Sequence, residues 1–179
     1  MNFFGPRFCH DEGKRVAEAL AYAYRLQHKI DIRIARIFNA YGPGMLPYDD
    51  RPVPNFITAA LAGREIEITG DGNASRFQFV TDCTQGLITL MNSSCESPVN
   101  IGSDHGTSIK DLAKTIRDIV AQKTKQTTVV LLKFTAQRED DPFGRQPDIR
   151  SAKEKLGWEP KVDLTEGLEA SVDWFISRI

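Results

Sequence analysis

Several features that assign a sequence to a particular class of protein are absent from these 179 residues. No apolar run approaches the ~18 residues that suggest a membrane-spanning helix. The N-terminus, MNFFGPRFCHDEGKR, has no apolar core and becomes charged quickly, which argues against a signal peptide. A formal net charge of −1 gives no general field to attract nucleic acid or an anionic membrane. We therefore expect a cytoplasmic protein without a nucleic-acid partner; a membrane anchor upstream of Met1 stays an open alternative.

Cysteine is too scarce and too scattered for a disulfide framework or a metal centre. The three cysteines, Cys9, Cys83 and Cys95, are odd in number and lack metal-ligand spacing. Reduced thiols in a cytosolic setting are the expected state, and no metal site is predicted.

The absence with the largest consequence is that of a glycine fingerprint, G-x-G-x-x-G or G-x-x-G-x-x-G, after a strand. The nearest candidate is GDGNAS at 70–75, which lies between two short predicted strands. No helix start follows it to hold a pyrophosphate, so we interpret it as a hairpin turn rather than a phosphate loop.

The elements that are present predict a mixed α/β chain of about one domain's length. Acidic residues followed by apolar residues at helical spacing predict a helix over 11–28, and alternating apolar residues predict a strand over 31–38. Ser108 and Asp111 have capping-box spacing, which predicts a helix over 109–120. Further helices are expected at 55–62 and at 82–92, the latter with Asp82 as N-cap. A last helix is expected after an Asp163–Glu166 capping box, and its apolar face includes Leu168, Val172, Phe175 and Ile176. Further strands are expected at 66–69, 76–80, 99–101 and 127–132.

Few residues are obvious candidates for chemistry. His10 and Lys14 are four apart at a helix start and can share a face, although a solvated first turn is the more common reading of such a pair. Arginine has a planar fork that suits phosphate and carboxylate groups. Four arginines near loops or strand ends therefore make an anionic ligand worth considering: Arg36, Arg51, Arg76 and Arg145.

The string RIFNAYGPG at 36–44 resembles the R-x-x-N-x-Y-G-P segment of extended short-chain dehydrogenases that act on nucleotide sugars. Further segments follow in that family's order across essentially the whole chain, and together they are most similar to the UDP-glucuronate decarboxylase subfamily. The dTDP-glucose 4,6-dehydratases and UDP-sugar 4-epimerases are the nearest alternatives. The matching segments are GPRFCHDEGKR (5–15), NFITAAL (55–61), GDGNASRFQFVTD (70–82), SPVNIG (97–102), DDPFGRQPDIRSAKEKLGWEP (140–160) and LTEGL (164–168).

This resemblance implies the fold class and its division. Residues 1–45 would be a remnant of a Rossmann-like NAD-binding domain that carries the catalytic helix and the following strand. Residues 46–179 would form mainly a smaller mixed α/β domain that binds the nucleotide sugar, with some segments returning to the Rossmann-like part. The glycine fingerprint of the family would lie upstream of Met1, so we expect a truncated form.

The resemblance also implies a reaction. In such enzymes NAD is bound throughout, the sugar 4-hydroxyl of UDP-glucuronate is oxidised, CO₂ leaves from the 4-keto intermediate, and reduction yields UDP-xylose. The base is the tyrosine of a Tyr-x-x-x-Lys motif, whose position here is His10, with Lys14 retained. The imidazole is shorter than a phenol by an ångström or more, and misplacement on that scale can cost on the order of 100-fold in rate. Lys14 also disfavours the imidazolium that must form, so this carboxy-lyase relative is expected to be catalytically impaired.

Most of the other family positions are kept, with one exception. Gly44 stands where the family commonly has arginine, which puts one cofactor contact of this loop in doubt. The helix at 11–28, which includes Tyr24 and Gln27, matches the helix that forms the dimer interface; it predicts a homodimer or a heterodimer with an intact paralogue. The resemblance implies cofactor contacts at Lys14, Asn39 and Arg51, and contacts to the UDP phosphates and ribose at Asn55, Arg76 and Arg145.

Overall fold

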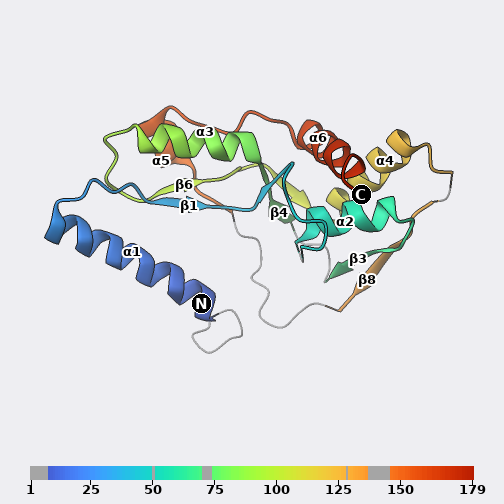
Figure 1. Cartoon of the computed structure of the whole chain (residues 1–179), viewed down its shortest axis with the longest axis horizontal. Helices are drawn as coiled ribbons and strands as arrows, with labels where there is room; N and C mark the ends of the chain where they lie inside the picture. Colours follow the sequence, from blue (N-terminus) through green and yellow to red (C-terminus); the bar gives the residue numbers. More distant parts are fainter. Residues whose placement is uncertain (1–7, 50, 70–73, 128, 137–145) are drawn as a thin grey trace.

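The computed structural model describes residues 8–49, 51–69, 74–127, 129–136 and 146–179 (Figure 1). These residues form a mixed α/β structure, with α1 at one end of the long axis and the β3–β8 pair at the other. The helices are α1 (Phe8–His28), α2 (Pro52–Leu61), α3 (Val80–Met91), α4 (Ile109–Thr124), α5 (Arg150–Leu156) and α6 (Leu164–Ile176); the strands are β1 (Ala35–Ile37), β2 (Ala40–Tyr41), β3 (Ile66–Thr69), β4 (Ala74–Arg76), β5 (Gln78–Phe79), β6 (Val99–Ile101), β7 (Gly106–Ser108) and β8 (Leu132–Thr135).

The strands pair two by two, and most pairs join segments that are distant in the sequence. β1 pairs with β6, β2 with β5 and β3 with β8, all in parallel, whereas β4 and β7 are antiparallel. Parallel strands need a crossover connection, and helices supply several of these crossovers here. The pairing of β1 with β6 joins a strand from the first predicted domain to one from the second. The domain boundary at residue 45 stays a prediction.

Two apolar cores hold the elements together. The larger lies between α2, α4, α6 and β3, and the smaller lies between β6, α3 and α5. Burying one large aliphatic or aromatic side chain contributes roughly 1.5–3 kcal/mol, so these clusters dominate the stability of the body. Fully buried members of the larger core include Ile57, Ile66, Ile116, Leu168 and Phe175; the smaller core includes Leu90, Val99, Ile101, Ala152 and Trp158.

The predicted helices are confirmed with shifted ends. The helix predicted at 11–28 already begins at Phe8, and the one predicted at 109–120 continues to Thr124, where Lys125 takes a left-handed conformation (φ 54°) and stops it. Ser108 caps α4 as expected, because its hydroxyl accepts from the Asp111 backbone N–H at 2.9 Å. Of the four residues predicted on the apolar face of the last helix, Leu168, Val172 and Phe175 are buried, whereas Ile176 is 42% exposed.

The hairpin predicted around 70–75 is wrong. The strand before it, β3, pairs with β8, and the strand after it, β4, pairs with β7. The alternation of Ile66 and Ile68 fits a strand with one buried face but says nothing about its neighbour. Burial against α2 and α4 decides the pairing, since both isoleucines are fully buried there.

Asp82 is not the N-cap of α3, which corrects a second expectation. The helix begins at Val80, with Phe79 as the capping residue, so Asp82 lies inside the first turn. Its buried carboxylate accepts from the backbone N–H groups of Lys161 and Val162, at 3.0 and 2.9 Å. Asp82 therefore fastens the segment that leads into α6 to the start of α3.

Short strands differ most from their predictions. Of the strand predicted at 31–38, Ala35–Ile37 form β1, and backbone hydrogen bonds to β6 extend to Ile34 and Phe38. The strand predicted at 127–132 begins at Leu132 instead. The strand predicted at 76–80 is divided: β4 ends at Arg76, and β5 is followed at once by α3. The elements β7 and α5 were not predicted.

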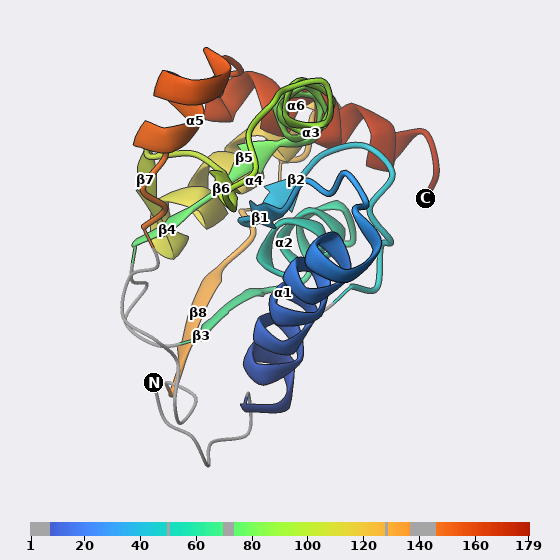
Figure 2. The same ribbon diagram turned by 90° about the vertical axis from the view of Figure 1, so that its left-hand side faces the viewer.

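The helix α1 lies apart from the rest of the molecule (Figures 1 and 2). Three apolar side chains at helical spacing, Val16, Leu20 and Tyr24, are 52%, 55% and 53% exposed. Its contacts with the body include charged groups. Glu18 accepts two hydrogen bonds of 2.7 Å from Arg36 on β1, and Arg25 donates to the carbonyl oxygens of Ile32 and Glu96, the latter at 2.9 Å.

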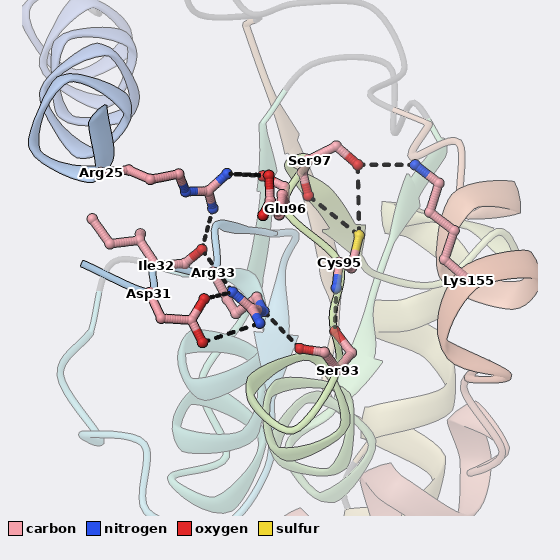
Figure 3. A network of polar contacts seen from close by, with 9 residues as sticks. All are labelled: Arg25, Asp31, Ile32, Arg33, Ser93, Cys95, Glu96, Ser97 and Lys155. Carbon is pink, nitrogen blue, oxygen red and sulfur yellow. Dashed lines mark hydrogen bonds and ion pairs between the residues drawn. The ribbon is translucent and has the colours of Figure 1, made fainter. Parts of the chain in front are cut away.

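Figure 3 shows the second of these attachments, where α1 meets the chain before β1 and the loop before β6. Arg25 reaches Ile32 and Glu96, and Arg33 donates to the Ser93 carbonyl oxygen at 2.8 Å. Both arginine side chains are mostly buried. The direction of α1 is therefore set by directional polar contacts beside β1 and β6.

We predict that Glu18→Gln loosens α1. The hydrogen-bonded Arg36 lowers the pKa of Glu18 from its ordinary value of 4.5. Because the folded-state pKa is the lower one, the pair stabilises the docked helix above pH 4.5 and loses this contribution as pH falls through the folded value. Both partners are partly exposed, so the loss is at most about 1 kcal/mol. Hydrogen–deuterium exchange at pH 7 should show faster exchange in α1.

The matched control is Arg15→Gln, whose ion pair with Glu12 at 3.7 Å lies within α1. Equal exchange of α1 in Glu18→Gln and Arg15→Gln would contradict a docking role for the Glu18–Arg36 pair.

Asp82→Ala should destabilise the body by about 1–3 kcal/mol, since two backbone N–H groups lose their buried acceptor. Chemical denaturation monitored by circular dichroism measures this loss. Asp118→Ala removes an exposed carboxylate paired with Arg117 and should change the unfolding free energy much less. A loss in Asp82→Ala no larger than in Asp118→Ala would refute this role of Asp82.

Candidate functional site

The carboxyl ends of β1 and β6 form the edge where the candidate site residues begin. In open α/β sheets, ligands bind outside the carboxyl ends of the parallel strands. β1 and β6 end together, with Ile37 beside Ile101, and Asn39 follows two residues later. The helix α1 runs opposite to β1 in Figure 1, with Glu18 contacting Arg36. Its first turns therefore lie towards this same end.

Asn39 is held at this edge by both its side chain and its backbone. The side-chain amide donates to the Ser75 hydroxyl at 3.2 Å. The Asn39 carbonyl accepts from the Gln78 backbone N–H at 2.9 Å. Ser75 belongs to β4, opposite Thr107 of β7. The end of β1 is thus joined to the β4–β7 pair.

Arg76 follows Ser75 in β4, and one of its side-chain N–H donors makes no hydrogen bond to the described residues. Its Nη2 donates to the Gln146 side-chain oxygen at 2.9 Å, whereas its Nε is buried and has no partner among the described residues. Gly106 lies opposite, and a Cβ there would come within 3.3 Å of Arg76 Nη2. Asn39 with Ser75, and Arg76 with Gln146, are two hydrogen-bonded pairs that meet at the consecutive residues Ser75 and Arg76 of β4, and we call these four residues the Asn39–Arg76 cluster. A guanidinium with an unused donor at a strand end can bind an anionic group.

The other arginines have different surroundings. Arg36 is engaged by Glu18 through two hydrogen bonds. Arg51 binds both carboxylate oxygens of Asp49 from Nε at 2.9 Å, and this contact lowers the pKa of Asp49. Arg145 lies outside the described residues. Of the four arginines considered for an anionic ligand, Arg76 is thus the one for which the structure records an unused buried donor.

His10 and Lys14 lie on the first turns of α1, and both are exposed. Their spacing of four places them on one helical face. Asn55 is exposed in the first turn of α2, with its backbone N–H bonded to the Arg51 carbonyl at 3.3 Å. A hydrogen bond joins Asn39 to Ser75, the chain neighbour of Arg76, whereas no such contact joins His10, Lys14 or Asn55 to this cluster among the described residues.

Two cavities are found among the described residues, one near the amino ends of β1 and β6 and one next to the Asn39–Arg76 cluster. One of about 340 Å³ lies between α1 and the segment before β6, lined by Glu18, Tyr22, Arg25 and Glu96 among others. The second, of about 530 Å³, lies at the start of α5 and is lined by Asp104, Gln146, Pro147, Asp148, Ile149, Arg150 and Lys153. Its charged groups pair with each other, since Arg150 lowers the pKa of Asp148 to about 2. Gln146 connects this cavity to Arg76.

Sequence reasoning missed two residues of this region. Ser75 gave no signal, because serine in a glycine-rich turn is ordinary. Gln78 gave a weak one, since it is the polar residue between Phe77 and Phe79 in a strand-like run. In the structure Gln78 is buried at the junction of β1, β5 and β6.

The described part of the chain contains no helix long and apolar enough to cross a membrane. It also contains no group of three or more histidine, cysteine or acidic side chains placed to hold a metal ion. For NAD the residues present do not suffice: the 179-residue sequence has no glycine fingerprint, and Arg51 is already bound to Asp49.

Curated proteins similar to this chain are UDP-glucuronic acid decarboxylases. UDP-glucuronic acid decarboxylase 1 of Xenopus tropicalis is 46% identical to this chain over 98% of its residues. UDP-glucuronic acid decarboxylase 3 of Arabidopsis thaliana is 44% identical over all of this chain. The chain spans only 40% and 51% of these two proteins. The similarity therefore covers this chain entirely and its relatives in part.

Solved structures with a similar fold are nucleotide-sugar epimerases. UDP-glucose 4-epimerase of Thermotoga maritima, solved with UDP-glucose, has a TM-score of 0.81 and 30% identity, with 91% of this chain and 52% of that chain covered. UDP-glucuronic acid 4-epimerase of Bacillus cereus, solved with UDP-glucuronic acid and NAD, has a TM-score of 0.78 and 27% identity, with 89% and 50% covered. These neighbours confirm the expected Rossmann-like α/β class.

A family model described as GDP-mannose 4,6 dehydratase matches residues 2–171, which is nearly the whole chain. This match agrees with the decarboxylase and epimerase relatives and with the parallel α/β pairs of the structure. The chain belongs to the GDP-mannose 4,6 dehydratase family.

Proposed function

We propose that this chain forms the UDP-sugar-binding part of a UDP-glucuronate decarboxylase. The identity of 46% to a decarboxylase, against 30% to an epimerase of similar fold, supports this reaction class over epimerisation or dehydration. The observation that carries the proposal is the Arg76 guanidinium at the end of β4, which donates to Gln146 and has an Nε without a partner among the described residues. Such a donor suits an anionic diphosphate.

In this proposal the Asn39–Arg76 cluster binds and orients the nucleotide sugar. Arg76 would donate from its guanidinium to a phosphate oxygen, a charge-assisted bond that is stronger than a neutral one. The side-chain amide of Asn39 offers both a donor and an acceptor to the sugar or the cofactor. Asn55 and Arg145 would add contacts to the phosphates and ribose.

Hydride transfer is not assigned to these residues. NAD, when bound in a complete site, accepts hydride from the sugar; Lys14, Asn39 and Arg51 are the residues proposed to contact it. His10 would have to act as base at a tyrosine position, with a shorter ring and a neighbouring ammonium that opposes its protonation. We therefore propose that the chain by itself binds UDP but does not turn over UDP-glucuronate.

A second candidate function is a non-catalytic module that pairs with an intact relative through α1. The exposed stripe of Val16, Leu20 and Tyr24 favours it, because apolar stripes of this kind mark contact surfaces. A homodimer through the same stripe is the related possibility. Either assembly would cover side chains that the isolated chain leaves in water.

The first test is UDP binding to the purified 179-residue chain by isothermal titration calorimetry. Wild type should bind UDP, and Arg76→Ala should weaken binding by about 10- to 100-fold, as expected for loss of a bond from a charged donor. Arg64→Ala, which removes an exposed arginine before β3, should bind like wild type. Absence of UDP binding, or equal affinities for Arg76→Ala and wild type, would overturn the proposal.

The second test concerns turnover and pairing. With NAD and UDP-glucuronate, the chain alone and its His10→Tyr variant should both form no UDP-xylose, and product from either would refute the absence of turnover.

The pairing module is tested separately. Mixed with a full-length decarboxylase, the wild-type chain should co-elute in size-exclusion chromatography with light scattering. Leu20→Glu should abolish co-elution, whereas Ile179→Glu, at another exposed apolar side chain, should not. Unchanged co-elution of Leu20→Glu would exclude the module.

A further inference from the structure

Gln78 is the most deeply buried uncharged polar side chain beside the candidate site, with 1% of its surface exposed. Its side-chain nitrogen donates to the Phe38 carbonyl oxygen at 3.0 Å and to the Ile101 carbonyl oxygen at 2.8 Å. Two carbonyl oxygens require the NH₂ side of the amide, so this network fixes its orientation. The amide thereby bridges the carboxyl ends of β1 and β6.

The backbone of Gln78 makes a further contact with direct bearing on the site. Its N–H donates to the carbonyl oxygen of Asn39 at 2.9 Å, so one residue binds the two peptide groups that flank the Asn39 Cα. Phe38 in turn donates from its own N–H to Ile101 at 3.0 Å. The backbone from which the Asn39 side chain projects is therefore held at successive points.

We propose that Gln78 is the positioning residue for Asn39. Resting on the proposed function, this inference assigns to Gln78 the task of holding the Asn39 amide in the orientation that meets the nucleotide sugar. The energetic reason is burial: carbonyl groups that lose their donor inside the core must move or stay unsatisfied. Movement of the Phe38 carbonyl rotates the peptide that joins it to Asn39.

The orphaned oxygen of Gln78 supports this assignment over a purely structural one. Its Oε1 is buried and has no partner among the described residues, which costs stability that an apolar side chain would not lose. A residue selected for packing alone would avoid that cost. The contribution of the amide lies in the two carbonyl oxygens that its N–H groups hold in place.

The test compares Gln78→Met with Val172→Ala. Methionine keeps the length and removes both side-chain donors, whereas Val172 belongs to the larger core and to none of the contacts of Gln78. Both variants should unfold at lower temperature. Only Gln78→Met should weaken UDP binding, by about 3- to 10-fold, as for the loss of one aligned hydrogen bond. Only this variant should shift the nuclear magnetic resonance signals of the Asn39 side-chain amide without ligand.

Unchanged Asn39 signals and unchanged UDP affinity in Gln78→Met, despite lower stability, would make Gln78 a structural residue and overturn the inference. If wild type binds no UDP, the proposed function fails, and the ligand-free Asn39 signals still decide the role of Gln78. If Gln78→Met does not fold, titration of wild type with UDP decides: the Gln78 and Asn39 side-chain amide signals should shift together. A shift of Asn39 alone would count against positioning.

Discussion

The parallel pairing of β1 with β6 is the contact on which the rest of the structure depends. It joins the segment that carries α1 and β1 to the body, and it brings Asn39 to the edge where Gln78 and Ser75 meet it. Such a short pair is not stable alone, so helices must cover it. Gly86 allows α3 to approach closely, since a Cβ there would come within 2.9 Å of Ile101.

The two faces of this pair are held by different physics. On one face α3 and α5 pack through buried apolar side chains. Asp82 and Tyr41 hold the segment that leads into α6 by hydrogen bonds to Lys161 and Leu164. Burial raises the pKa of Tyr41, so its hydroxyl stays protonated and donates to the Leu164 carbonyl oxygen. On the other side α1 is attached by Glu18 and Arg25. Because burial contributes more per side chain than a partly exposed ion pair, α1 is the element most sensitive to pH, salt and partners.

Helices could be predicted here because their period persists over ten or more residues and caps such as Ser108 mark their starts. Strand partners could not, since a strand of two to four residues carries almost no period and its parallel partner is distant. Asp82 illustrates the limit: the sequence marks it as a capping residue, but its hydrogen-bond donors lie in another segment. The arginines show the same limit, because their side chains are chemically identical and differ only in their partners. Arg36 is paired with the carboxylate of Glu18 and Arg51 with that of Asp49, whereas Arg76 donates to the neutral amide of Gln146.

Under the proposed function, this division of the structure separates recognition from catalysis. The Asn39–Arg76 cluster belongs to the body, where Gln78 and the strand ends keep its geometry through buried hydrogen bonds. His10 and Lys14 belong to α1, whose position depends on charged contacts with Arg36 and the chain before β1 and β6. A change at His10 therefore leaves the packing of the cluster untouched. Under the proposed function, the chain would lack the geometry for proton transfer and still keep a site for an anionic sugar nucleotide.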